Sequence, residues 1–155
     1  MYVLNTMSAR SCLNNGAITT GNVGLVLTSN NGVYSQFLTS NTALVVSNIA
    51  LGKGVWNIQI AENITFTNAQ VSKLQISLND RNIVPAKLYL AKGLRGVTPD
   101  ETLNALDSFN DNLVLTFTVP TVLNFFIVAT FSSGTIQISN PLITTGKFIT
   151  ATKLA

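Results

Sequence analysis

Two aspartates have the spacing that comes closest to a cation site. Asp107 and Asp111 flank Ser108, Phe109 and Asn110, and calcium prefers carboxylate and carbonyl oxygens as ligands. The stretch lacks the glycine and the bidentate glutamate of a calcium-binding loop, so the favoured interpretation is a solvated loop. We therefore expect no metal ion and no other cofactor.

The side chains used in most acid–base catalysis are missing or few. The 155 residues include no histidine and six carboxylate side chains. Without histidine, Ser-His-Asp and Cys-His nucleophiles and histidine-ligated metals are excluded. The single cysteine, Cys12, excludes an intramolecular disulfide and a zinc site built from several cysteines. We expect that the protein is not an enzyme and assign no catalytic residue.

Trp56 is the only tryptophan, and its ring is either a ligand platform or part of the core. An exposed ring can stack against a sugar. The side chains that would accompany it in such a site are Asn57, Gln59, Tyr34 and Tyr89. In a strand, however, Trp56 shares one face with Ile58 and Ile60, because side chains two residues apart point the same way. The favoured interpretation makes these three residues anchors of the core.

The composition indicates an apolar protein with few charges. Charged residues make up 10% of the chain, and the mean hydropathy is +0.38. No apolar run approaches the roughly 20 residues that span a bilayer, so we expect no membrane insertion. The excess apolar surface is assigned to contacts between subunits. Lysines and arginines are scattered singly, whereas nucleic-acid binders cluster them, so no nucleic-acid partner is expected.

Alternation of apolar and polar residues recurs along the chain, while the period of a helix is nearly absent. It predicts half-buried strands over residues 56–60, 64–66, 74–78 and 113–119. Shorter runs are bounded by turn residues such as Asn31 and Gly32, which suit a type I′ hairpin. This spacing predicts an all-β antiparallel sandwich of roughly eight to ten strands over residues 21–155.

Two other segments lack the alternation. Thr98 is a helix-cap residue followed by a proline, by Glu101 and then by Leu103 and Leu106, which predicts one short helix in a loop. Residues 1–20 are weakly patterned and are predicted to be an amino-terminal attachment arm. They contain no basic region followed by an apolar region, so no secretory signal is expected.

Residues 124–131 predict a strand that is apolar on both faces. In an antiparallel sandwich one face of a strand normally meets water, so the outer face of this strand must be covered. A second subunit and a segment of the same chain both remain open as the cover. The predicted subunit-interface residues are Phe125, Phe126, Ile127, Val128 and Phe131.

Two stretches resemble known structural proteins. Residues 51–58, Leu-Gly-Lys-Gly-Val-Trp-Asn-Ile, follow a Thr-, Ser- and Asn-rich run and are similar to a passage of the trimeric C1q/TNF-like jelly rolls. Residues 134–138 and 146–154 resemble the closing strands of small structural proteins of tailed bacteriophages. The resemblance covers residues 41–155 and implies a jelly-roll homotrimer on a virion.

The resemblance implies a capsid decoration, a head fibre or a fibre tip. Such a protein would attach to other virion proteins and could bind a host-surface glycan. The alternative is a carbohydrate-binding, lectin-like sandwich, which would need an exposed aromatic ring beside Asn, Asp or Gln. Both hypotheses describe a binding or assembly protein without a catalytic role.

Overall fold

The computed structural model describes residues 23–29, 35–81, 87–93, 101–141 and 147–155. Within these residues the chain forms strands and no helix. The strands are β1 (Val26–Thr28), β2 (Ser35–Phe37), β3 (Leu44–Leu51), β4 (Gly54–Asp80), β5 (Lys87–Gly93), β6 (Thr102–Phe117), β7 (Thr121–Ser139) and β8 (Ile149–Lys153). All of their pairings are antiparallel. The predicted all-β antiparallel fold is confirmed.

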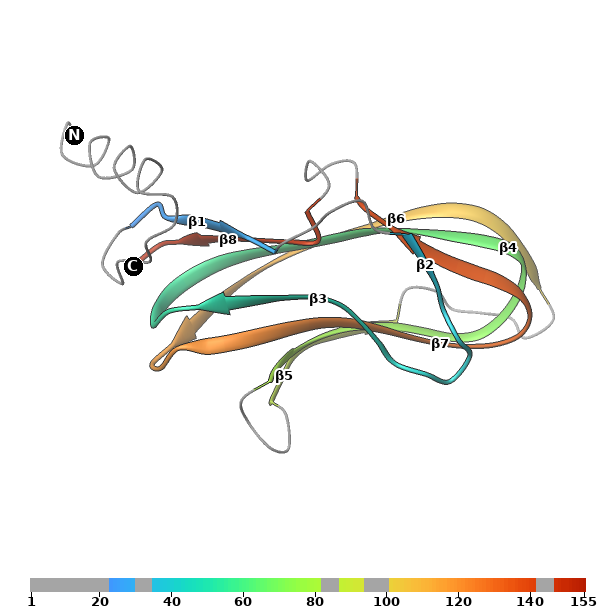
Figure 1. The fold of residues 1–155 in the computed structure, drawn as a ribbon, viewed down its shortest axis with the longest axis horizontal. Helices are drawn as coiled ribbons and strands as arrows, with labels where there is room; N and C mark the ends of the chain where they lie inside the picture. The colour runs from blue at the N-terminus through green and yellow to red at the C-terminus, as the bar shows by residue number, and fades with distance from the viewer. Residues whose placement is uncertain (1–22, 30–34, 82–86, 94–100, 142–146) are drawn as a thin grey trace.

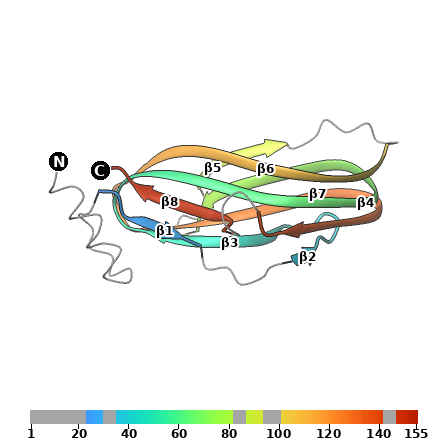
Figure 2. The same ribbon diagram turned by 90° about the horizontal axis from the view of Figure 1, so that it is seen from above.

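The strands form two packed layers, which we call layer A and layer B (Figure 1). Layer A contains the strands β1, β2, β6 and β8, together with the first half of β4 and the second half of β7. Layer B contains β3, the first half of β7, the second half of β4 and β5. Figure 2 shows β5 and β6 along one long side of the sandwich and β2 and β3 along the other.

The 27-residue strand β4 and the strand β7 belong to both layers, because each bends at the end of the sandwich away from the C-terminus (Figure 1). The register shifts between Phe66 and Ala69 mark the bend of β4. Asn68 there has a positive φ of 47°, and its backbone N–H donates to the Asn104 side chain at 2.8 Å. Gly134 of β7 has a φ of 73°, and a Cβ at this position would collide with the Asn68 carbonyl. The close approach of the two backbones at this point therefore requires glycine.

The core lies between the layers and is built from the inward residues of the alternating strands. Trp56, Ile58 and Ile60 are fully buried on one side of β4. The Trp56 indole N–H donates to the Gly52 carbonyl at 2.9 Å, so the polar group of the ring has a partner inside the fold. Phe125 of β7 is fully buried in the same cluster.

The predicted helix is wrong where the structure describes its residues. Thr102 begins β6, so Leu103 and Leu106 lie in a strand. They point to opposite sides of that strand, and Leu103 is buried while Leu106 is exposed. Pairing of these residues with Ala69 and Thr65 of β4 overrides the local helix-start signal. The rest of the helix signal lies outside the described residues.

Several other predictions fall outside the described residues. These are the arm over residues 1–20, the turn at Asn31 and Gly32, and the side chain of Tyr34. In the part of the chain that the structure does describe, no helix has the length and apolar character needed to cross a membrane.

Candidate functional site

The outer face of layer B is rich in apolar side chains. Alternation along β7 turns Phe126 and Val128 outward, because the residues on either side of each are fully buried. Val45 of β3 lies directly opposite Phe126 in the register, and 54% of its surface is exposed. We call this region the apolar face, defined by Val45, Phe126, Val128, Leu88 and Ala91.

The apolar face takes its residues from β3, β7 and β5, and the polar Ser77 of β4 lies between those of β7 and β5 in the register. Val45 pairs with Phe126, Phe126 pairs with Ser77 of β4, and Ser77 pairs with Ala91 of β5. A register shift between Val45 and Ser47 inserts an extra residue in β3. Without the bulge Val45 would share the inward side of Ser47, which lies opposite the buried Phe125, and the extra residue turns Val45 outward. The bulge is the local feature that adds an exposed valine to this face.

The structure divides the predicted interface residues between two environments. Phe125 and Ile127 are fully buried inside the chain's own core, so no partner can reach them. Phe131 is partly buried and packs against the same core. Phe126 and Val128 are the two members of the predicted set that lie half-buried on the apolar face. An interface with another subunit stays a prediction.

The outer face of layer A carries a network of amide and hydroxyl groups beside a few exposed apolar side chains. Ser108 donates to the Asn63 side-chain oxygen at 2.8 Å, and the Asn63 amide donates to the Asn140 carbonyl at 3.2 Å. The Gln59 amide donates to the Asn110 side chain at 3.2 Å. These bonds orient side chains of β4 and β6 along the surface. We call this region the polar face.

The structure excludes Trp56 as a surface platform for a ligand. The ring is fully buried, and the Lys153 ammonium lies 5.9 Å from its centroid. Asn57 and Gln59 point from the opposite side of β4, toward the polar face. Tyr89 packs edge-on against Phe117 of β6 with ring centroids 5.7 Å apart. Of the residues considered for a sugar site around Trp56, the described ones, Asn57, Gln59 and Tyr89, are therefore not brought together with its ring at the surface.

Asp107 and Asp111 lie in strand β6, so the interpretation of this stretch as a solvated loop is wrong. They project from the same side of β6, and Asp111 forms an ion pair with Lys92 of β5 at 2.5 Å. A cavity of about 300 Å³ is lined by Ile64, Asp107, Ser108 and Phe109. Among the described residues, no cluster of acidic or thiol side chains is arranged to hold a metal ion.

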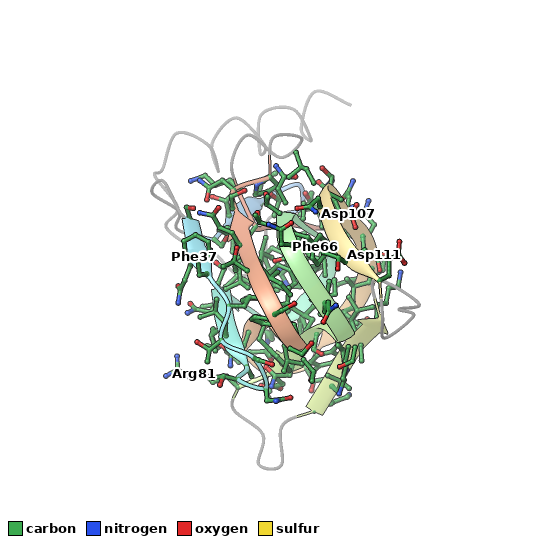
Figure 3. The ribbon with its side chains drawn as sticks, turned by 90° about the vertical axis from the view of Figure 1, so that its right-hand side faces the viewer. Phe37, Phe66, Arg81, Asp107 and Asp111 are labelled. Atoms are coloured by element: carbon green, nitrogen blue, oxygen red, sulfur yellow. The ribbon has the colours of Figure 1, made fainter. Side chains whose placement is uncertain are left out.

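The position of these aspartates has a structural explanation. Within the described residues β6 pairs with β4 alone, so its second edge has unpaired backbone groups. Charged side chains that point inward from such an edge oppose pairing with another chain. Figure 3 shows Asp107 and Asp111 on this edge strand, at the side of the sandwich away from β2.

Glu62 is a buried acid that the sequence analysis did not single out. It follows Ile60 by two residues on β4, so the alternation turns it toward the core, and it is fully buried. Neither of its carboxyl oxygens has a hydrogen-bond partner among the described residues. Burial raises the pKa of Glu62 from 4.5 to about 8, because the charged form loses its hydration. Its place in the alternating run was the signal that could have found it.

Comparisons with known proteins identify the fold. No protein-family model matches the sequence, and no curated protein matches it. Among solved structures, the chain is similar to Eiger TNF from S. frugiperda, with 12% identity over 86% of this chain and 92% of that chain and a TM-score of 0.52. This likeness confirms the predicted jelly-roll fold.

Two further structures give lower scores. One, described as CBM4, shares 11% identity over 85% of this chain and 81% of its own, with a TM-score of 0.49. The other is infectious bursal disease virus Gt strain, with 10% identity over 84% of this chain and a TM-score of 0.45. The chain spans 37% of the length of that viral chain. At these identities the comparisons concern the fold alone, and the chain is an antiparallel jelly roll.

Proposed function

We propose that the protein is a non-enzymatic virion structural protein: a homotrimer that decorates a capsid, forms a head fibre or tips a fibre. The observation that carries the assembly part of this proposal is the apolar face. Val45 is 54% exposed beside Phe126, at one end of a row of register partners that runs from β3 to β5. Exposed apolar patches of this kind mark contacts between proteins.

A second copy of the chain is the partner that fits the apolar face. Its central residues Val45, Phe126 and Val128 are uncharged and lie on the paired strands β3 and β7, so they form a surface fixed by the sheet. Interface cores are depleted in charge and enriched in aromatic residues, and Phe126 supplies such a residue. The trimeric state is the one implied by the resemblance of residues 51–58 to C1q/TNF-like jelly rolls.

The mass of the protein in solution tests the assembly. Size-exclusion chromatography with light scattering at micromolar concentration should give three times the 16.6 kDa of one chain. Val45→Asp should lower that mass, because it places a charge opposite Phe126 in the desolvated contact. Val114→Asp is the matched control, since Val114 is 60% exposed on the polar face of layer A.

Two outcomes would contradict this assembly. A monomeric mass for the natural chain would remove the homotrimer. Dissociation by Val114→Asp with no effect of Val45→Asp would place the contact on the polar face. Circular dichroism of both variants shows whether the fold is retained, which is expected because both valines are more than half exposed.

The virion part of the proposal rests on the sequence. The strands are covered with Asn, Thr, Ser and Gly, and 10% of residues are charged, which is typical of virion proteins. Residues 134–138 and 146–154 add the resemblance to tailed-bacteriophage structural proteins. Mass spectrometry and immunogold labelling of purified virions from the host culture should find the chain on the particle. Its absence from particles that are otherwise complete would contradict a virion role.

A further inference from the structure

One aromatic side chain stands exposed beside the polar face. Phe37 of β2 is 59% exposed, and Figure 3 shows it at the side of the sandwich opposite β6. In the register Phe37 lies directly opposite Gln137 of β7, whose neighbours Ile136 and Ile138 are fully buried. Gln137 therefore points outward, and the ring of Phe37 lies next to an outward amide.

Register partners extend this contact across the layer in two rows, in which every side chain except Phe37 and Leu106 is polar. Gln137 pairs with Thr65 of β4, and Thr65 pairs with Leu106 of β6. The adjacent row runs through the same four strands. We call the two rows the Phe37 patch, formed by Phe37, Gln137, Thr65, Leu106, Ser35, Ser139, Asn63 and Ser108.

Hydrogen bonds within the Phe37 patch hold its polar groups in place. The Gln137 amide donates to the Ser35 hydroxyl at 2.5 Å, on the strand that carries Phe37. Ser108 donates to Asn63 at 2.8 Å on the far side of the patch. Polar groups that are already ordered lose less conformational entropy when they bind a ligand.

The chemistry of the patch points to a neutral saccharide. None of its eight side chains is ionisable, so it offers no cation to a phosphate backbone or to an anionic lipid headgroup. An exposed ring offers an apolar face for stacking, and neighbouring amides and hydroxyls bind the hydroxyl groups of a sugar. From β2 to β6 the patch spans three strand spacings, about 14 Å, so an oligosaccharide can cover both the ring and the amides.

We infer that the Phe37 patch is a binding site for neutral oligosaccharides. Phe37 supplies the stacking surface, and Gln137 with Ser35 supplies the adjacent hydrogen-bonding groups. This site differs from the sugar site first considered around Trp56, which the fold buries. It lies on layer A, whereas the apolar face lies on layer B, so the inference does not depend on the proposed trimer.

Affinity electrophoresis of the full chain tests the site. The probes are gels that contain soluble neutral polysaccharides, namely mannan, xyloglucan, dextran and galactan, with carboxylated alginate and pectate for comparison. At least one neutral gel should retard the chain, and a glycan array should give neutral oligosaccharides as the bound class. Phe37→Ala should weaken the retardation about tenfold or more, because it removes the aromatic ring on which the sugar stacks.

Matched variants separate binding from folding. Phe37→Trp should keep binding, and its indole emission should change when the oligosaccharide is added. Gln137→Ala should weaken binding. Val119→Ala is the control for Phe37→Ala, because Val119 is 62% exposed in the turn between β6 and β7. Asn112→Ala is the control for Gln137→Ala, since Asn112 pairs with Gln59, six residues or about 20 Å along β4 from Thr65.

The outcomes are distinct. Retention of binding by Val119→Ala and Asn112→Ala, with loss in Phe37→Ala, supports the site. Failure of every neutral glycan to bind at millimolar concentration overturns the inference, as does binding that Phe37→Ala leaves unchanged. Binding of the acidic polysaccharides alone also overturns it, since the patch has no cation to explain it.

Discussion

Glu62 of β4 lies directly opposite Phe109 of β6, with its carboxyl group enclosed between the two layers. The next inward residues of β6 on either side of Phe109 are Asp107 and Asp111, and Asp111 is held by Lys92. Glu62 thus has an aromatic neighbour in the register and no hydrogen-bond partner among the described residues. Such a group is stable in the fold in its neutral form.

The stability of the protein should fall as the pH rises from about 4.5 to about 8. The pKa of Glu62 is about 8 in the folded chain, whereas the ordinary value of 4.5 applies in the unfolded chain, so between these limits the folded state binds a proton that the unfolded state has released. The contribution of this group is complete below pH 4.5 and is lost as the pH approaches 8. In this range the free energy of unfolding should fall by roughly 1.4 kcal/mol per pH unit, the value for one group that is protonated in the folded state and ionised in the unfolded state. Urea denaturation at a series of pH values measures it.

Glu62→Gln should remove most of this slope, because glutamine is neutral at every pH. Glu101→Gln is the control, since Glu101 is exposed at the start of β6 and its substitution should leave the slope in place. Equal slopes in the natural chain and in Glu62→Gln would show that Glu62 does not determine the pH dependence.

Gly134→Ala should destabilise the fold by about 1–3 kcal/mol or more, the range for a residue held in a disfavoured backbone conformation. The φ of Gly134 is positive, and an added Cβ would collide with the Asn68 carbonyl where β7 and β4 bend together. Gly93→Ala is the matched control, because the nearest atom to its added Cβ is 3.9 Å away. Thermal melting of the two variants should show a clear drop for Gly134→Ala and little change for Gly93→Ala.

The fluorescence of Trp56 should report a fully enclosed ring. As the only tryptophan, buried and bonded to the Gly52 carbonyl, it should resist acrylamide quenching until urea unfolds the chain. The double variant Trp56→Phe with Phe37→Trp provides the exposed reference at a position that is 59% exposed. Strong quenching of the native Trp56 would contradict its place in the core.

The alternation in the sequence predicted most of the strands but missed the first part of β6, and it did not predict the course of the strands. Residues 56–60 and 74–78 were predicted as separate strands, and both belong to β4. The continuity of β4 through its bend depends on the close contact between Asn68 and Gly134. These residues are 66 positions apart, so no local pattern encodes the contact. The helix signal at Thr98 failed for the related reason that pairing with β4 determines the conformation of residues 102–106.

The candidate sites were predicted less well than the fold. The apolar run over residues 124–131 gave Phe126 and Val128, but the exposure of Val45 depends on a bulge in β3. Phe37 lies in a three-residue strand, which is too short to show a period. Its neighbours Gln137 and Thr65 come from strands distant in sequence, so only the sheet register brings them together.

The two proposed surfaces should act independently, because the apolar face is on layer B and the Phe37 patch is on layer A. Val45→Asp should therefore leave the affinity of one subunit for a soluble neutral oligosaccharide unchanged in titration calorimetry. On a surface coated with the same glycan it should weaken binding by roughly 10²-fold or more, because a trimer binds such a surface through several sites at once. Phe37→Ala should give the opposite result, with loss of binding in both assays and an unchanged mass in solution. A change in the calorimetric affinity on Val45→Asp would show that the two faces are coupled.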